Sequence, residues 1–294
     1  MHSIARICAL FMIAASCLLQ ASPAKAGEPL IANGESLAFL GDSITANGNS
    51  NPLGYVRLVV AGLNANGIKV KPYPAGVSGH KSNDMLARLQ RDVIDKKPTW
   101  MTLSCGVNDV WHGANGVPLP KYQTNITAIV EKAQAAGIKV MILTSTLIGE
   151  DVTNKNNQIA LPYNDFLRSL AAAKKCPLAD LNADMRAALA AMDEATRKRG
   201  NQLTADGVHM NAAGDQIMAA GILRAFGLSD AQLARAHEAW LDMPQSVNVG
   251  GQPRVSPKEF QQLKSIADKQ KRNVNDLVND AVTGTLSNLL QSAK

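Results

Sequence analysis

Residues 36–43 read Ser-Leu-Ala-Phe-Leu-Gly-Asp-Ser, and this stretch decides the fold. Residues 36–40 form a short apolar run that ends at a glycine-containing turn, which is typical of a buried β-strand. The turn places a serine hydroxyl, Ser43, directly after the strand. We therefore expect a strand in the protein core that delivers polar groups at its carboxyl end.

Further strands and helices are expected to alternate along the chain. Short apolar runs predict four more strands, at residues 68–73, 99–105, 139–145 and 178–181. Apolar residues at helical spacing predict helices at residues 54–66, 82–95, 119–136, 161–174 and 212–226. Such alternation implies parallel crossover connections, so the sequence predicts an α/β fold, a three-layer αβα sandwich around a five-stranded parallel sheet. In these sheets ligands bind beyond the carboxyl ends of the strands.

Four short motifs lie at those strand ends or just before the last helix. They are Gly41-Asp42-Ser43, Ser78-Gly79-His80, Gly106-Val107-Asn108-Asp109 and Asp206-Gly207-Val208-His209. Each alone has a structural explanation, since Gly-Asp-Ser forms tight turns and Asp caps helices. Together they suit nucleophilic catalysis. A serine hydroxyl becomes a good nucleophile when a histidine takes its proton and a carboxylate fixes that histidine's tautomer.

In this order the motifs resemble the consensus blocks of the SGNH (GDSL) hydrolase superfamily over roughly residues 36–226. The resemblance implies the flavodoxin-like SGNH fold and a serine esterase that works through an acyl-enzyme. It also implies that Ser43 is the nucleophile and that Asp206 and His209 complete the catalytic triad.

The same resemblance implies an oxyanion hole made by the backbone amides of Ser43 and Gly79 and the side-chain amide of Asn108. Gly76 is a competing glycine near the second motif, but the spacing of Val77-Ser78-Gly79 favours Gly79. Asp109 is expected to support its neighbourhood rather than to act in catalysis.

Several side chains beside the motifs are expected to line the substrate cleft, with partly exposed loop positions as the alternative. They are Asp42, His80, Trp111 and His112. No cluster of His, Cys or carboxylates has the ligand spacing of a metal site, and no glycine-rich phosphate loop is present, so no metal and no other cofactor is expected.

The substrate is expected to be an acetylated carbohydrate. Superfamily members include lipases, thioesterases, lysophospholipases and carbohydrate deacetylases. Here the loop at 149–158 carries Asn154, Asn156 and Asn157, and Trp111 is suited to stacking on a sugar ring. The alternatives are a lysophospholipase or thioesterase type of lipid hydrolase and a non-catalytic glycan-binding module.

The N-terminal residues 1–26 have the layout of a secretory signal peptide. Arg6 precedes an apolar run at 7–19, which is shorter than the about 20 residues that span a bilayer, and Ala24-Lys25-Ala26 suits signal peptidase. We expect cleavage after Ala26, a periplasmic or secreted product and no stable membrane span afterwards. A buried N-terminal helix and lipidation at Cys17 are the alternatives.

The expected hydrolase domain, 27–228, is followed by a helical extension at 229–294. It comprises a helix at 229–243, a linker at 244–253 and an amphipathic region after Ser256, which is expected to pack or to form a homodimer. The pattern is also similar to ribbon-helix-helix DNA-binding segments, a role that export argues against. The net charge is +6, but Lys and Arg are interspersed with Asp and Glu along the chain, so no nucleic acid partner is expected. Cys105 and Cys176 are each expected to be a small buried hydrophobe, and whether they pair is left open.

Overall fold

The computed structural model describes residues 28–198, 200–243, 257–272 and 274–292. The chain divides into two compact units, residues 1–246 and residues 247–294. The expected signal peptide and the expected linker at 244–253 lie outside the described residues.

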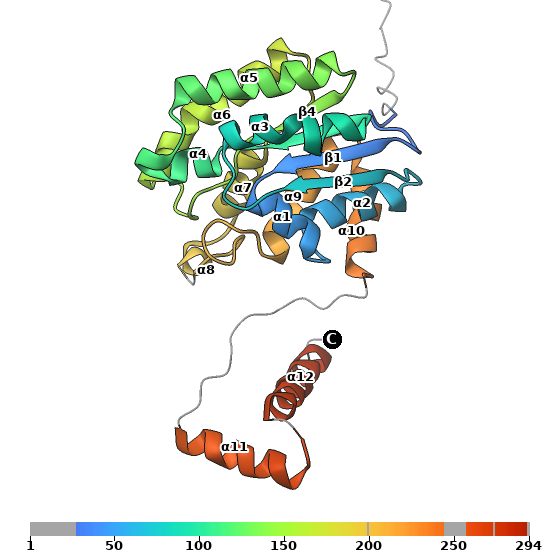
Figure 1. The fold of residues 1–294 in the computed structure, drawn as a ribbon. Coiled ribbons are helices and arrows are strands. Elements are labelled where there is room, and N and C mark those ends of the chain that lie inside the picture. The colour runs from blue at the N-terminus through green and yellow to red at the C-terminus, as the bar shows by residue number, and fades with distance from the viewer. Residues whose placement is uncertain (1–27, 199, 244–256, 273, 293–294) are drawn as a thin grey trace, which may run out of the picture. The chain divides into compact units, whose positions relative to one another are not determined.

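The first unit is built on a five-stranded parallel sheet of order β2-β1-β3-β4-β5 (Figure 1). The strands are β1 (Ser36–Gly41), β2 (Lys71–Gly76), β3 (Trp100–Ser104), β4 (Lys139–Leu143) and β5 (Leu178–Ala179). This is the flavodoxin-like strand order. The predicted α/β class and the five-stranded parallel sheet are confirmed.

Helices cover both faces of the sheet, which gives the predicted three layers (Figure 1). They are α1 (Ser43–Ser50), α2 (Tyr55–Ala65), α3 (Ser82–Asp92), α4 (Val107–Trp111), α5 (Leu119–Ala135), α6 (Lys155–Ala173), α7 (Leu181–Ala191), α8 (Glu194–Arg197), α9 (Ala212–Ala225) and α10 (Asp230–Leu241), with 3₁₀ turns η1 (Ile94–Lys96) and η2 (Gly113–Asn115). Figure 1 shows α3, α5 and α6 on one face, and α1, α2 and α9 on the other. The central strands β1 and β3 are almost wholly buried between these layers.

The second strand lies three residues later than the sequence predicted, at Lys71–Gly76 instead of 68–73. It contains Pro72 and Pro74, which lack the N–H that an inner strand must donate on both sides, and accordingly β2 is an edge strand. Its last residue, Gly76, pairs with Gly41 at the end of β1. A Cβ at Gly76 would lie 2.3 Å from the backbone nitrogen of Ala46, so this glycine lets α1 pack closely on β2.

Helix α6 begins earlier than the predicted residue 161. The Asn154 side chain caps it by accepting a hydrogen bond from the backbone N–H of Asn157 at 2.8 Å, and the helix then runs through Pro162. Buried Tyr163 and Leu167 anchor the part after the proline. Capping and packing therefore outweigh the cost of the internal proline.

Helix α10 was expected to belong to the C-terminal extension, but it packs on α2 of the first unit. Ala236 and Trp240 are buried in the core, and the Trp240 indole Nε1–H donates to the carbonyl of Leu58 at 2.8 Å. The first compact unit therefore continues past the expected boundary at residue 228, to residue 246.

The second unit consists of α11 (Pro257–Lys269) and α12 (Val274–Ser292). Within it Ala267 is buried, whereas Ile266, Leu289 and Leu290 are exposed. That this unit packs or dimerises through its apolar side chains stays a prediction. In the described part of the chain, no helix combines the length and the apolar character needed to span a membrane.

In the part of the chain that the structure describes, Cys105 and Cys176 are free thiols, Cys105 buried and Cys176 half-buried. They do not pair.

A buried carboxyl links α9 to α2. Asp215, in the first turn of α9, is 3% exposed and accepts a hydrogen bond from the backbone N–H of Tyr55 at 2.8 Å. Burial raises the pKa of Asp215 to about 7, although the hydrogen bond from Tyr55 opposes the shift. Ionisation of this carboxyl therefore works against the folded state near neutral pH.

Replacing Trp240 tests the assignment of α10 to the first unit. We expect Trp240→Ala to lower the free energy of unfolding by about 3–5 kcal/mol, because a buried aromatic side chain is lost. The neighbouring Leu241 is 66% exposed, so Leu241→Ala should change it by less than about 0.5 kcal/mol. Urea unfolding followed by circular dichroism measures both. Equal stability of the two variants would contradict the packing of α10.

Replacing Asp215 tests the electrostatic cost of its burial. The folded pKa of about 7 lies above the ordinary 3.8, so the folded state holds a proton that the unfolded chain releases, and wild-type stability falls as pH rises through this window. Asp215→Asn keeps an acceptor for Tyr55 and does not titrate. Its free energy of unfolding relative to wild type should therefore grow from about pH 4 to about pH 7 and then level off. Urea unfolding across this range measures the difference, and a difference independent of pH would refute the expectation.

Candidate active site

Ser43 is the first residue of α1, directly after β1. The Asp42 side chain caps this helix, since its Oδ1 accepts the backbone N–H of Ile44 at 2.9 Å. Asp42 is only 2% exposed, so the structure does not place it on a surface that a substrate can touch, in contrast to the sequence-based expectation. Burial raises the pKa of Asp42 to about 6, the Ile44 bond lowers it, and nearby Asp109 adds to the rise.

Ser43, His209 and Asp206 form one line of hydrogen bonds. The Ser43 Oγ lies 2.9 Å from Nε2 of His209, and Nδ1 of the same ring lies 2.6 Å from Oδ2 of Asp206. A proton on Nδ1 that is donated to the carboxylate leaves Nε2 free to accept from the serine hydroxyl. The structure therefore brings together the three predicted residues, although 166 positions separate Ser43 from His209.

Asp206 is held in place by its own loop. Its Oδ1 accepts the backbone N–H groups of Val208 at 3.0 Å and His209 at 2.8 Å. Partial burial alone would raise the pKa of this carboxyl, but the hydrogen bonds from the His209 ring, the His209 amide and the Val208 amide outweigh it and lower the pKa to about 2. Asp206 is thus an anion at neutral pH.

Two backbone amides beside the serine are available as donors. No described residue accepts a hydrogen bond from the N–H of Ser43 or of Gly79. Gly79 has φ of +77°, a left-handed backbone conformation that favours glycine. Ser43 and Gly79 both follow the carboxyl ends of their strands, β1 and β2.

Asn108 lies in the first turn of α4, after β3, and is 4% exposed. Its Nδ2 donates to the carbonyl of His80 at 3.1 Å and lies 3.4 Å from Oδ2 of Asp42. The first contact fixes the amide next to the Gly79 loop. The second is long for a hydrogen bond, which leaves that N–H weakly engaged.

Arg88 is a buried residue of this region that the sequence analysis missed. Its guanidinium is 5% exposed and donates to the carbonyls of Gly41 and Ala75, each at 2.8 Å. Its Nε donates to Nδ1 of His80 at 3.0 Å, and an ion pair with Asp92 spans 3.1 Å. Arg88 therefore links the ends of β1 and β2 to the loop that carries Gly79. The sequence signal was an arginine on the apolar face of α3, between buried Met85 and Leu89.

The remaining predicted side chains are placed as follows. His80 is half-buried, with its Nδ1 accepting from Arg88, so the neutral ring carries its proton on Nε2. Trp111 is 46% exposed at the end of α4, and its ring meets that of His112 edge to face. Asp109 is buried and accepts the backbone N–H of Ser82 at 3.0 Å, which links α4 to the start of α3.

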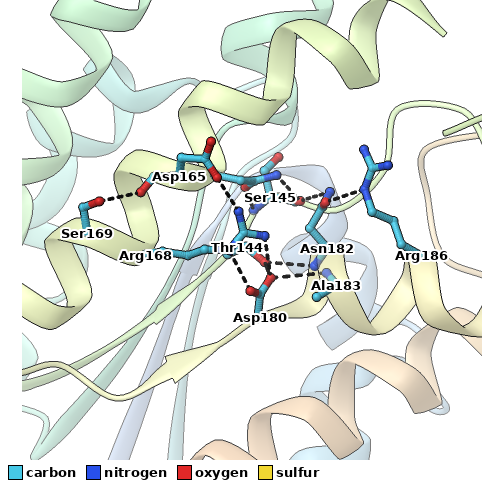
Figure 2. A network of polar contacts seen from close by, with 10 residues as sticks. Thr144, Ser145, Asp165, Arg168, Ser169, Asp180, Asn182, Ala183 and Arg186 are labelled. Atoms are coloured by element: carbon cyan, nitrogen blue, oxygen red, sulfur yellow. Dashed lines mark hydrogen bonds and ion pairs between the residues drawn. The ribbon is translucent and has the colours of Figure 1, made fainter. Parts of the chain in front are cut away.

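A second polar network holds the carboxyl ends of β4 and β5 together (Figure 2). Thr144 donates to Asp180 at 3.0 Å, and Arg168 binds the same carboxylate through Nε at 2.7 Å and a second nitrogen at 3.0 Å. The Asn182 amide donates to the carbonyl of Ser145 at 3.0 Å. Since β5 has only two residues, these side chains supply much of its attachment.

Among the described residues, no three His, Cys, Asp or Glu side chains gather closely enough to hold a metal ion. The chemistry that this arrangement supports on its own is proton transfer from the Ser43 hydroxyl to His209, with amide donors close by.

Comparison with known proteins identifies the family to which this chain belongs. The model of the GDSL-like lipase/acylhydrolase family matches residues 39–217. An acetylxylan esterase of Geobacillus stearothermophilus is 27% identical over 216 residues, which is 67% of this chain and 96% of that enzyme. Esterase TesA of Pseudomonas aeruginosa is 33% identical over 110 residues, 37% of this chain and 53% of that esterase.

Solved structures match about two thirds of this chain. Axe2, an acetylxylan esterase from Geobacillus stearothermophilus, has a TM-score of 0.61 at 27% identity and covers 68% of this chain and 97% of its own. Catalytic mutants of Axe2 replace a serine, an aspartate or a histidine by alanine. The α/β hydrolase enzyme LAE5, from the metagenome of Lake Arreo, has a TM-score of 0.61 at 27% identity and covers 68% of this chain and 98% of its own. Since the family model spans more than half of the residues, this chain belongs to the GDSL-like lipase/acylhydrolase family of SGNH hydrolases and is a serine carboxylic ester hydrolase.

Proposed function

We propose that Ser43, His209 and Asp206 are the catalytic triad of this esterase and that its substrate is an acetylated carbohydrate. The observation that carries the proposal is the line of hydrogen bonds from Asp206 through His209 to Ser43, at 2.6 and 2.9 Å. The catalytic mutants of Axe2 involve the same three residue types, which supports the assignment.

In the proposed reaction the Ser43 Oγ attacks the ester carbonyl carbon while Nε2 of His209 takes the hydroxyl proton. The tetrahedral intermediate collapses to an acyl-enzyme, and His209 returns the proton to the leaving alcohol. Water then attacks the acyl group by the same route, which releases the acid and restores Ser43. The ionised Asp206 stabilises the imidazolium that forms in each step.

The negative oxygen of each intermediate is proposed to bind the backbone N–H groups of Ser43 and Gly79 and the side-chain amide of Asn108. The two backbone donors have no acceptor among the described residues, and the Asn108 amide is only weakly engaged by Asp42 at 3.4 Å. Donors that are fixed before the reaction gain most strength when charge develops on the substrate.

The carbohydrate assignment rests on two supports. Similarity to acetylxylan esterases covers nearly the full length of those enzymes, at 96% and 97%. In addition, the 46% exposed Trp111 follows Asn108 on the same short helix and offers an aromatic surface for a sugar ring. His80 and His112 are proposed to contribute polar contacts to the same substrate.

We also propose that the chain is exported, with residues 1–26 as its signal peptide. The apolar run at 7–19 and the small residues Ala24 and Ala26 support this assignment.

Replacing Ser43 tests the triad. We expect Ser43→Ala to reduce kcat/KM for 4-nitrophenyl acetate by at least about a thousandfold, because the nucleophile is lost. The matched control is Ser50→Ala, at the exposed end of the same helix, which should keep wild-type activity. If wild type and Ser43→Ala hydrolysed the ester equally well, the proposed triad would be wrong. If both were inert and the protein bound glycan, the non-catalytic binding module would be favoured.

The length of the acyl group tests the substrate class. We expect kcat/KM to be highest for acetate esters and lower for octanoate and palmitate esters, and we expect acetate release from acetylated xylo-oligosaccharides. Steady-state rates with the three acyl lengths on one alcohol measure the preference. A clear preference for the long acyl groups would instead support the lysophospholipase or thioesterase alternative.

A further inference from the structure

We propose that Glu150 is a positioning residue that holds the Asp206–His209 loop in the geometry required for catalysis. This inference rests on the proposed function of those two residues. Glu150 lies in the segment between β4 and α6, far from both ends of the triad in sequence.

The Glu150 carboxylate binds three consecutive backbone amides. Its Oε2 accepts the N–H of Gln202 at 2.6 Å, and its Oε1 accepts the N–H groups of Leu203 and Thr204, each at 2.8 Å. The Thr204 hydroxyl donates to the same Oε1 at 2.6 Å. Hydrogen bonds to an ionised acceptor are about twice as strong as neutral ones, so four of them fix residues 202–204 firmly.

These three residues enter the tight loop that carries the catalytic pair. The Thr204 Oγ, which donates to Glu150, also accepts the backbone N–H of Gly207 at 3.1 Å. From the Glu150 side, the Gly149 N–H donates to the carbonyl of Gly207 at 2.6 Å. The peptide between Asp206 and His209 is therefore held from the Thr204 side and from the Gly149 side.

The segment that carries Glu150 is itself fixed by buried amides. Asn157, 1% exposed, accepts the N–H of Ile148 at 2.9 Å and donates to the carbonyls of Gly149 at 2.9 Å and Asp151 at 2.8 Å. Asn154 donates to the carbonyl of Ile148 at 2.8 Å. These two asparagines were expected to face a sugar, but their side chains form hydrogen bonds to the backbone of the segment that carries Glu150.

Glu150 is placed to act on the rate through position alone. Its carboxylate contacts neither Ser43 nor the ring of His209, and its four donors all belong to residues 202–204. Through residues 202–204, Glu150 determines the position of His209 relative to Ser43. A misplacement of about 1 Å in such a pair costs about a hundredfold in rate.

The test is Glu150→Gln, which keeps the shape but removes the charge and turns an amide NH₂ toward N–H donors. We expect kcat for 4-nitrophenyl acetate to fall by about 10- to 100-fold. KM should change by less than about threefold, because no substrate contact is lost. Glu150→Asp keeps the charge and should retain more activity than Glu150→Gln. The matched control is Glu131→Gln on α5, which removes the ion pair of Glu131 with Lys174 and should leave kcat unchanged.

A purely structural role would lower the melting temperature without changing kcat of the folded fraction. All variants are therefore assayed at a temperature where circular dichroism shows them fully folded, together with the rate at which a fluorophosphonate labels Ser43. Parallel losses of kcat and labelling rate support the proposal. Should Glu150→Gln not fold, Thr204→Val removes the hydroxyl contacts with little change of shape and is expected to lower kcat in the same way.

Wild-type kcat in folded Glu150→Gln, or in Thr204→Val where the former does not fold, overturns this proposal while leaving the triad intact. Failure of the proposed function would look different, since Ser43→Ala would then be as active as wild type.

Discussion

The parallel pairing of β1 with both β2 and β3 is the constraint on which the rest of the site depends. In register, Gly41 pairs with Gly76 and Leu40 with Leu103, so the three strands end side by side. The segments that follow them carry Ser43, Gly79 and Asn108. The pairing of the three strands therefore brings the proposed nucleophile and the proposed amide donors to one end of the sheet.

Buried polar groups then hold that edge in a single arrangement. Arg88 reaches the carbonyls at the ends of β1 and β2 and the ring of His80, with 5% of its side chain exposed. A buried guanidinium is tolerated because its donors meet acceptors, and removing one acceptor would leave a buried N–H donor without a partner. The loop that carries Gly79 consequently has little freedom to move relative to Ser43.

The sequence predicted the parts of this molecule that are encoded locally. Runs of apolar residues predicted four of the five strands close to their observed positions. Short motifs pointed to Ser43 and His209, whose side chains lie 2.9 Å apart. It misplaced β2, because the prolines at 72 and 74 are acceptable only on a sheet edge, and edge position is a property of the whole topology. It also missed Arg88 and Glu150. Arg88 reaches the carbonyl of Gly41, 47 residues away, and the partners of Glu150 lie 52 or more residues away, so no local sequence pattern predicts these contacts.

The two parts of the proposed triad are also linked through the helices that follow them. Thr45 in α1 bonds the Tyr55 hydroxyl at 2.8 Å, and the backbone N–H of Tyr55 donates to Asp215 in α9, which begins just after His209. Helix α1, which begins at Ser43, is thus joined through Tyr55 to α9, which follows His209, by two buried hydrogen bonds. Since one of these bonds ends on a carboxyl whose pKa is raised to about 7 by burial, this link carries an electrostatic cost at neutral pH. A neutral acceptor at position 215 would keep the hydrogen bond from Tyr55 without that cost, so the link between the two helices needs the acceptor and not its charge.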